Sequence, residues 1–343
     1  MAPTLVNTHN EWDPLREIVV GTATGAQIPR VKDRALHCIN YATLGAEEFA
    51  AISTGPYPER VIEESNEDLD LFAADLEKMG IRVRRPAPAD FTELYATEDW
   101  EVDGCYSYCP RDAILTIGDQ AIESPMSLRH RQNEGRLYRH LVETVRAPRP
   151  RLRDEIYEHV LGKPTLRDDE PVFDAANCLK LGRDVIYLIS NTGNRAGARW
   201  LQEHLGDGYR VHAVENVYAF QHVDSTIVPL RPGLVMVCPD RINDENLPAY
   251  FRGWDVIYPP DPVETPFDPA WSPASKWIAL NCLSLSPELV CVEKSQTGLM
   301  RTLEGHGLQC YPMQLRHMRT MAGGPHCVTL DLVREGTLED YSS

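Results

Sequence analysis

The stretch NCLKLGRDVIYLIS, residues 177–190, contains two short apolar strand-like runs, and an amphipathic helical pattern follows it. Strand-like runs open in the same way at RDAILTIGDQAIESP (111–125), DSTIVPLRPGLVMVCPD (224–240), NCLSLSPELVCVEKS (281–295) and CVTLDLV (327–333). These starts recur at intervals of roughly 45 to 65 residues, which is typical of structural units that pack side by side. The sequence therefore predicts an α/β protein built from repeated units.

Apolar spacing near 3.6 residues predicts the helices that belong to these units. The expected helices cover residues 60–80, 127–145, 194–205, 245–254 and 297–306. Further strand-like runs begin at Ile81, Tyr209, Asp255 and Leu308. The apolar stripe of the first helix consists of Leu69, Phe72, Ala73, Leu76 and Met79. Gly80 is a stop signal for that helix.

The two ends of the chain each carry a strand without a neighbour. REIVVG (16–21) has no strand before it, and the strand at 327–333 has no helix after it. Pairing these two strands would close the units into a ring and remove two exposed sheet edges. The first residues of the units would then converge on a common axis. An ordinary doubly wound sheet is the alternative, because alternating strands and helices support it equally.

Length and composition restrict the class of protein. No Ser/Gly linker or low-complexity break divides the 343 residues, so we expect a single domain over residues 1–343. The formal net charge of −17 argues against binding to nucleic acid. No apolar stretch is long enough to span a membrane, and the first residues do not resemble a secretion signal.

The nine cysteines show no repeated close pairing. Reduced thiols in the cytoplasm are the simplest explanation, and we expect a cytoplasmic protein. Cys105 and Cys109 are the closest pair, but no nearby histidine or second cysteine pair completes a metal site. The sequence predicts no metal and no cofactor.

The segment QHVDSTIVPL, residues 221–230, carries an imidazole next to a carboxylate. On a strand, His222, Asp224 and Thr226 would project to one side. Such a histidine can exchange protons near neutral pH beside a fixed negative charge. A structural pair on the surface is the alternative. Acidic residues and a thiol at equivalent places in other units favour the catalytic interpretation.

Cys327 in AGGPHCVTL is the candidate nucleophile. The two glycines before it permit a tight backbone path that would hold the sulfur at the mouth of the strand. Only the thiolate attacks, and His222 is the candidate acceptor of its proton. His326 should point to the opposite face of the strand and is a poor candidate, unless a turn at this position redirects it.

Three carboxylates complete the candidate site. Asp174 in FDAAN could orient His222 as the third member of a Cys–His–Asp set, or it could cap a turn. Asp112 and Asp224 would then remain unpaired. A planar guanidinium with five donors satisfies two such carboxylates.

These residues lie in motifs that resemble one family, the arginine:amine amidinotransferases. The motifs run in order over nearly the whole chain: NEWDPLREIVVG, YCPRDAIL, ESPMSLR, EPVFDAAN, HVDSTIVPLRPG, CPDRINDEN, SKWIALN, GGPHCVTLD and REGTLEDY. The chain is most similar to the bacterial branch that amidinates aminocyclitol phosphates in aminoglycoside pathways. The glycine amidinotransferases and relatives in cyanobacterial toxin pathways are less similar.

The resemblance implies a fold and a set of roles. The implied fold is a fivefold pseudosymmetric α/β propeller of ββαβ modules. Cys327 corresponds to the nucleophile, His222 to the general acid and base, and Asp174 to its carboxylate partner. Asp112 and Asp224 correspond to the guanidinium-binding carboxylates. A contact with the carboxylate of the donor is implied for Arg241 and Ser275.

The chain departs from the glycine enzymes at two places. Ala274 stands before Ser275, where those enzymes have another serine, and Phe220 and Gln221 also differ. Glycine is therefore a less suitable acceptor than an aminocyclitol phosphate such as scyllo-inosamine phosphate. Candidate partners for such a phosphate are Arg129, Arg131 and Lys276, although solvated surface positions explain them equally well.

The expected reaction is a covalent transfer in two stages. The Cys327 thiolate attacks arginine, His222 protonates the departing ornithine, and an acceptor amine then takes the amidino group. The partners expected are arginine and an amine, and a homodimer is plausible by analogy. A guanidine hydrolase that admits water, a transferase with another acceptor, and an inactive scaffold remain alternatives.

Overall fold

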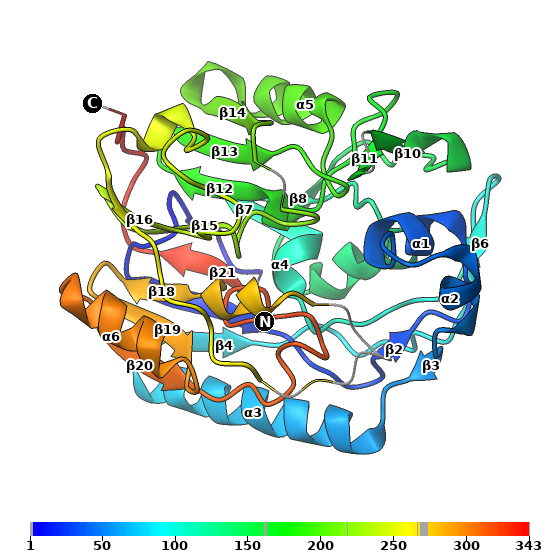
Figure 1. Ribbon diagram of the computed structural model, residues 1–343, viewed down its shortest axis with the longest axis horizontal. Helices are drawn as coiled ribbons and strands as arrows, with labels where there is room; N and C mark the ends of the chain where they lie inside the picture. Colours follow the sequence, from blue (N-terminus) through cyan, green and yellow to red (C-terminus); the bar gives the residue numbers. More distant parts are fainter. Residues whose placement is uncertain (1–2, 161–162, 218, 266, 268–273, 343) are drawn as a thin grey trace.

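The protein has a mixed α/β fold, described by a computed structural model for residues 3–160, 163–217, 219–265, 267 and 274–342 (Figure 1). The described residues form five three-stranded sheets. In strand order, these are β21 (Thr329–Arg334), β1 (Leu15–Val20) and β4 (Arg82–Arg84); β7 (Ile114–Ile117), β8 (Gln120–Glu123) and β9 (Thr144–Arg146); β12 (Cys178–Leu181), β13 (Asp184–Leu188) and β14 (Arg210–Val214); β15 (Ile227–Arg231), β16 (Leu234–Val237) and β17 (Asp255–Ile257); β18 (Leu283–Ser286), β19 (Leu289–Glu293) and β20 (Gln309–Met313). In each sheet the middle strand has one antiparallel and one parallel neighbour.

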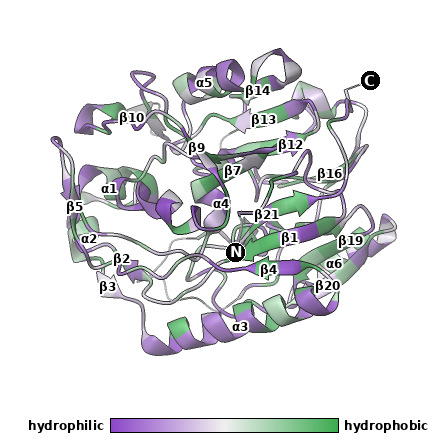
Figure 2. Cartoon of the chain, turned by 180° about the vertical axis from the view of Figure 1, so that it is seen from behind, coloured by the Kyte–Doolittle hydropathy of each residue, from purple (hydrophilic) through white to green (hydrophobic). Residues whose placement is uncertain are grey.

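The two ends of the chain meet in one sheet, as the sequence predicted. Strand β1 pairs antiparallel with β21, with Val20 opposite Thr329 and Ile18 opposite Asp331. Ile18 and Asp331 are both fully buried. Figure 2 shows these two strands in the interior, with much of their length coloured as apolar. Each terminal strand therefore gains a hydrogen-bonded neighbour, which covers an edge that would otherwise be open.

Three helices connect the second and third strands of their sheets, as parallel neighbours require. They are α3 (Glu59–Lys78), α5 (Arg195–Leu205) and α6 (Thr297–Gly305). Figure 1 shows α5 at the top of the molecule, α3 along the bottom and α6 at the lower left, beside its own strands. The stripe predicted for α3 is buried, except that Met79 is 41% exposed. Gly80 has a φ of +83°, a left-handed conformation that favours glycine at a helix end.

The helix predicted at 127–145 is wrong. This segment instead contains the short 3₁₀ helices η1 (Arg129–Arg131) and η2 (Glu134–Tyr138), followed by β9. All three side chains of η1 are buried, and the arginines bind partners in different parts of the chain. A regular helix would not direct three consecutive basic side chains to such dispersed partners.

The helix predicted at 245–254 is also wrong, because only η6 (Ala249–Phe251) forms there. Pro248 has no backbone N–H to continue an α-helix that began before it. Gly253, with a φ of +96°, ends the turn on the other side. The apolar spacing in this segment therefore reflects packing of a short turn.

A cluster of buried charges lies beside β21, and we call Glu11, Arg111, Lys180, Asp331 and Arg334 the Asp331 cluster. Asp331 accepts hydrogen bonds from Lys180 Nζ at 2.8 Å and Arg334 Nε at 2.9 Å, and it also pairs with Arg111. Burial opposes ionisation of Asp331, but the charges of Arg111 and Lys180 hold its pKa well below its usual value. These pairs tie β21 to two other parts of the chain, the segments that carry Arg111 and Lys180.

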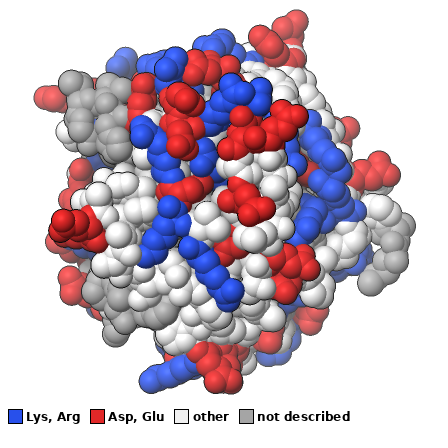
Figure 3. Space-filling view, turned by 90° about the vertical axis from the view of Figure 1, so that its right-hand side faces the viewer, with Lys and Arg blue, Asp and Glu red and all other residues white. Residues whose placement is uncertain are grey.

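The remaining elements lie mainly on the right in Figure 1, outside the five sheets. They are α1 (Arg34–Asn40), α2 (Ala46–Ala51), η3 (Asp154–Ile156), η5 (Gly206–Gly208) and the strand pairs β2 (Gln27–Ile28) with β3 (Gly55–Pro56), β5 (Tyr95–Ala96) with β6 (Glu101–Val102), and β10 (Tyr157–Val160) with β11 (Lys163–Leu166). Acidic and basic side chains are interspersed over the face in Figure 3. Within the described ranges, each helix is too short or too polar to cross a bilayer.

Candidate active site

Five of the residues predicted for the site lie just before the first strands of their sheets. Asp112 belongs to α4 (Pro110–Ala113), which leads into β7, and Asp174 precedes η4 (Ala175–Asn177), which leads into β12. His222 and Asp224 precede β15, and Cys327 precedes β21. The packing of α4 against η4 and β21 brings three of these strand entrances together.

His222 and Asp224 lie in a turn, so the predicted strand alternation is wrong for this segment. Strand β15 begins only at Ile227. The backbone N–H of Val223 donates to Ala176 O at 3.1 Å, and that of Thr226 donates to Val223 O at 2.8 Å. The first bond fixes the turn against η4. The two side chains still face the same group of residues, but the turn, and not strand geometry, is the reason.

Cys327 also lies in a turn, and the two glycines before it are needed for space. A Cβ atom on Gly323 would lie 2.7 Å from Cys109 Sγ, and one on Gly324 would lie 2.7 Å from the Cβ of Asn281. The backbone N–H of Cys327 donates to Asn281 Oδ1 at 2.8 Å. We did not assign Asn281 a role from the sequence, although it opens the fourth repeated unit.

His222 is surrounded by carboxylates. Its Nε2 lies 3.0 Å from Asp174 Oδ2, and its Nδ1 lies 3.6 Å from Asp112 Oδ1. Burial lowers the pKa of His222, but the charge of Asp112 and the hydrogen bond with Asp174 outweigh burial and raise the pKa to about 9. The imidazole is therefore a proton donor at neutral pH.

Asp174 is held on the side away from His222. Its Oδ1 accepts hydrogen bonds from the backbone N–H of Ser127 at 2.9 Å and from the Ser127 hydroxyl at 3.1 Å. Its second oxygen is thereby fixed toward the imidazole. Ser127 lies 47 residues away in sequence, and no motif predicted this contact.

Asp112 has one occupied and one free oxygen. Arg131 Nη1 donates to Asp112 Oδ2 at 2.6 Å, whereas the buried Asp112 Oδ1 accepts no hydrogen bond from any described residue. Arg131 also forms a two-pronged pair with the buried Glu134. Burial raises the pKa of Glu134 to about 7, against the charge of Arg131. His222 Nδ1 lies 3.6 Å from Asp112 Oδ1, beyond hydrogen-bond distance. A buried carboxylate oxygen that accepts no hydrogen bond is costly, so Asp112 Oδ1 marks a place for a donor.

Asp224 contacts the thiol. Cys327 Sγ lies 3.4 Å from Asp224 Oδ2 and is 2% exposed as a residue. The hydrogen bond with the Cys109 thiol, burial and the charge of Asp224 raise the pKa of Cys327 well above its usual value. Without substrate, the sulfur is therefore protonated and is a poor nucleophile.

The structure overturns our expectation for His326. The turn before β21 directs its ring toward the site, and Nδ1 lies 2.8 Å from Asp224 Oδ2. The strand rule placed His326 on the opposite face from Cys327, but that rule does not apply within a turn.

The three cations considered for a phosphate all have carboxylate partners. Arg129 is buried and pairs with Asp33 at 2.8 Å and Asp154 at 2.7 Å. Arg131 binds Asp112 and Glu134, as described above. Lys276 Nζ lies 2.6 Å from Asp261 Oδ1. The buried arginines thus have structural partners, and Arg129 is not available to a substrate in this arrangement.

Arg241 and Ser275 lie on neighbouring turns. Arg241 Nη1 donates to Thr226 Oγ1 at 2.6 Å, and no carboxylate of the described residues pairs with its guanidinium. Ser275 Oγ accepts a hydrogen bond from Trp277 N at the start of η7 (Lys276–Leu280). The indole N–H of Trp277 donates to Asp240 at 2.6 Å, which links η7 to the turn carrying Arg241. Arg241 therefore retains the capacity to bind an anionic group.

The arrangement combines a thiol, a protonated imidazole and carboxylates with a deficit of positive charge. Neither Asp174 nor Asp224 has a lysine or arginine within ion-pair distance among the described residues. A planar cationic substrate would supply that charge beside the thiol. Groups of three or more metal-ligating side chains with suitable geometry are absent from the described ranges.

Comparison with known proteins identifies the family. No family model matches the chain. The chain is 47% identical to inosamine-phosphate amidinotransferase 1 of Streptomyces glaucescens, over 98% of this chain and 99% of that protein. It is 35% identical to the L-arginine:L-lysine amidinotransferase of Pseudomonas savastanoi pv. phaseolicola, over 98% of this chain and 96% of that protein.

The fold leads to the same family. The structure of an inosamine-phosphate amidinotransferase from Streptomyces griseus matches with a TM-score of 0.94 and 47% identity, covering 99% of this chain and all of that one. The chain therefore belongs to the arginine:amine amidinotransferase family. It is an amidinotransferase, as the motifs predicted.

Proposed function

We propose that this enzyme transfers the amidino group of L-arginine to an aminocyclitol phosphate such as scyllo-inosamine phosphate and releases L-ornithine. Relatives named for inosamine phosphate are 47% identical to the chain, whereas the lysine-accepting enzyme is 35% identical. The departures at Phe220, Gln221 and Ala274 also disfavour glycine. The proposal includes a role in antibiotic biosynthesis, a cytoplasmic location and assembly as a homodimer.

Five sheets of one topology, with the chain ends paired, support a closed fivefold α/β propeller formed by a single catalytic domain over residues 1–343. In such a ring the entrances of β7, β12, β15, β18 and β21 surround one axis. This arrangement accounts for the origin of the site residues in separate sheets.

The unpartnered Asp112 Oδ1 is the observation that carries the assignment of the guanidinium site. Asp112 and Asp224 would hold the guanidinium between them, with its central carbon facing Cys327 Sγ. Binding of a cation next to both carboxylates offsets the negative charge that raises the pKa of the thiol. The substrate would therefore help to form the thiolate that attacks it. Because His222 is already protonated at neutral pH, it is not the acceptor that the sequence predicted, and the thiol proton would leave to solvent as the cation binds.

In the first half-reaction, the Cys327 thiolate forms a C–S bond with the guanidino carbon. His222 then donates a proton to the departing nitrogen, the C–N bond breaks and ornithine leaves. An amidino group remains on the sulfur. The protonated state of His222 at neutral pH suits this donor role.

In the second half-reaction, the acceptor amine occupies the place that ornithine left. His222, now neutral, takes a proton from the amine as its nitrogen bonds to the amidino carbon. The C–S bond breaks and the thiolate returns. Arg241 and Ser275 would bind the α-carboxylate of the donor, and Asp174 would orient His222 throughout.

Mass spectrometry with arginine labelled in its guanidino carbon tests the proposal. The enzyme is incubated with scyllo-inosamine phosphate, unphosphorylated scyllo-inosamine, glycine or lysine. We expect the label in the phosphorylated aminocyclitol, together with equimolar ornithine. Label only in glycine or lysine would overturn the acceptor, and labelled citrulline or urea without transfer would overturn the proposed reaction.

A further inference from the structure

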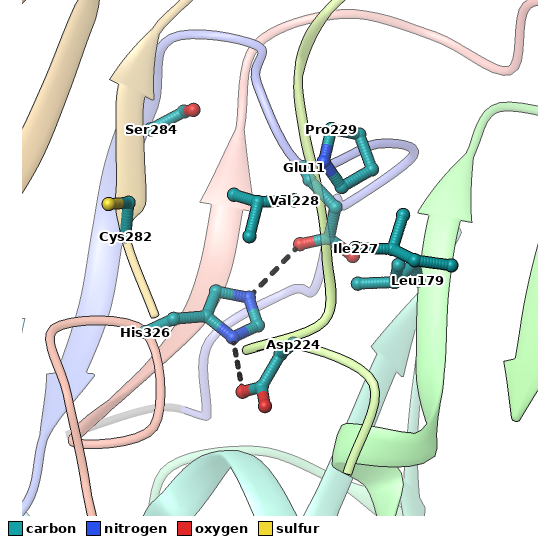
Figure 4. A pocket seen from close by; sticks show the side chains of 9 residues that line it. All are labelled: Glu11, Leu179, Asp224, Ile227, Val228, Pro229, Cys282, Ser284 and His326. Carbon is teal, nitrogen blue, oxygen red and sulfur yellow. Dashed lines mark hydrogen bonds and ion pairs between the residues drawn. The ribbon is translucent and has the colours of Figure 1, made fainter. Parts of the chain in front are cut away.

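The imidazole of His326 lies between two carboxylates that come from distant parts of the chain (Figure 4). Nδ1 is 2.8 Å from Asp224 Oδ2, and Nε2 is 3.4 Å from Glu11 Oε2. His326 and Glu11 are each 6% exposed, and Asp224 is 4% exposed. Each ring nitrogen thus has a buried acceptor.

This contact determines how Asp224 faces the reaction. The oxygen bound by His326 is the same Oδ2 that lies 3.4 Å from Cys327 Sγ. Burial raises the pKa of Asp224, but the hydrogen bond and charge of His326 outweigh burial and lower the pKa to about 2. With Oδ2 fixed in this way, the second oxygen is oriented independently of the thiol.

Glu11 is itself fixed from behind. Its Oε1 accepts a hydrogen bond from the backbone N–H of Lys180 in β12 at 2.8 Å, and Lys180 Nζ lies 3.9 Å from the same oxygen. Lys180 Nζ also binds Asp331 at 2.8 Å. A continuous line of buried contacts therefore runs from the Asp331 cluster through Glu11 and His326 to Asp224.

We propose that His326, braced by Glu11, is a positioning residue that keeps Asp224 ionised and oriented for the guanidinium of the donor. The inference rests on the proposed function, because it assigns Asp224 to that guanidinium. A hydrogen bond from Nδ1 to Asp224 Oδ2 opposes transfer of the thiol proton to that oxygen, so Asp224 remains anionic for the cation.

Two amide substitutions separate the two contacts of the ring. The side-chain nitrogen of asparagine can replace Nδ1, and that of glutamine can replace Nε2. His326→Asn therefore retains a donor to Asp224, whereas His326→Gln and His326→Ala remove it. Arginine affinity is measured by calorimetry in the Cys327→Ala background, so that binding is separated from chemistry. The KM and kcat for arginine are measured with the thiol present.

We expect His326→Ala and His326→Gln to weaken arginine binding by about tenfold or more, because a buried acceptor loses its donor. The KM for arginine should rise in parallel. His326→Asn should restore affinity to within about threefold. His212→Asn is the control, since His212 Nε2 also lies on a carboxylate, 2.6 Å from Asp184, in another sheet. It should leave arginine affinity unchanged.

Equal losses for the asparagine and glutamine variants, or no loss for any of the three, would overturn the inference. If the His326 variants do not fold, Glu11→Gln is measured instead: a loss of affinity above about threefold supports the inference, and an unchanged affinity overturns it. Absence of ornithine release by the unsubstituted enzyme would instead contradict the proposed function. Ornithine release combined with indifference to His326 contradicts this inference alone.

Discussion

Two neighbouring groups of buried charged side chains differ in their ratio of cations to carboxylates. In the Asp331 cluster, three cations surround Asp331, and only Glu11 adds a second carboxylate. Around His222 the carboxylates Asp112, Asp174 and Asp224 are in excess. Cations outnumber carboxylates in the first group. In the second, Arg131 is the one arginine of the described residues within ion-pair distance of these carboxylates, and Asp112 shares it with Glu134.

The difference indicates which group is structural and which binds a substrate. Burying charge is expensive, so a folded chain normally pairs its buried ions. The Asp331 cluster follows this rule and ties distant segments together. The carboxylates around His222 follow it less completely, because Asp112 shares Arg131 with Glu134, and Asp174 and Asp224 are paired with histidines. A further cation with the charge of arginine's guanidinium would complete their pairing. The predictions below test this division.

The largest expected effect is on the reacting atom. Cys327→Ala should reduce ornithine release by at least about 10³-fold, because the covalent step has no other nucleophile. Arginine should still bind, since the carboxylates remain. Ornithine is measured by chromatography and binding by calorimetry. Cys291→Ala, at a fully buried cysteine in β19, is the matched control and should retain activity. Comparable losses in both variants would show a general effect of changing the core.

The second largest effect should be on the free energy of unfolding. Asp331→Asn leaves Arg111, Lys180 and Arg334 around a neutral side chain, and we expect the free energy of unfolding to fall by about 3 kcal/mol. Urea denaturation followed by circular dichroism measures this change.

Asp340→Asn is the control for that experiment, because Asp340 pairs with Arg210 at the surface. Exposed ion pairs contribute little to stability, so the urea midpoint of Asp340→Asn should remain near that of the unsubstituted protein. If Asp331→Asn changed the KM for arginine without changing stability, the Asp331 cluster would belong functionally to the active site and the division would fail.

A pH profile tests the carboxylates around His222. With the pKa of His222 raised to about 9, kcat/KM for arginine should fall as the pH rises through that value, since the leaving amine loses its proton donor. In Asp112→Asn, the charge that favours the imidazolium is removed, so this alkaline limb should move to lower pH. We also expect kcat/KM to fall by about 100-fold at neutral pH, because the guanidinium loses one carboxylate.

Ornithine release between pH 6 and pH 10, roughly the range over which histidine and a raised pKa titrate, provides the measurement. Glu123→Gln is a suitable control. Glu123 lies in β8, in the sheet that follows Asp112 in the chain, and it pairs with Arg139. The alkaline limb of the Glu123→Gln profile should stay at the same pH. If the alkaline limb stays at the same pH in Asp112→Asn, the limb does not report the titration of His222.

The strand pairs and the pairing of the two terminal strands could be predicted from the sequence, because apolar runs and unpaired edges depend on local pattern. It predicted α3, α5 and α6 for the same reason. The segment at 127–145 failed because its apolar spacing competed with the burial of Arg129 and Arg131, whose partners lie far away in sequence. The sequence positions of those partners show no helical or strand periodicity, so apolar spacing could not reveal them.

The same distinction applies to the site. Asp112, Asp174, His222, Asp224 and Cys327 were selected because they open repeated units or lie in motifs. Their supporting contacts were not predicted: Ser127 behind Asp174, Arg131 on Asp112, and His326 on Asp224. Strand alternation even excluded His326. Turns position these side chains, and apolar periodicity carries little information about the conformation of turns.

The smallest effect should be on the reactivity of the thiol. Asp224→Asn removes one of the charges that raise the pKa of Cys327, so the thiolate fraction at pH 8 should increase. We expect iodoacetamide to alkylate Cys327 about tenfold faster, which corresponds to a pKa lower by roughly one unit. Peptide mass spectrometry follows that residue separately from the other cysteines, with Asp340→Asn as the control. Faster alkylation together with loss of arginine turnover would show that the carboxylate suppresses the free thiol while serving the bound substrate. Slower alkylation would mean that Asp224 assists thiolate formation directly, and the charge deficit would then need a different explanation.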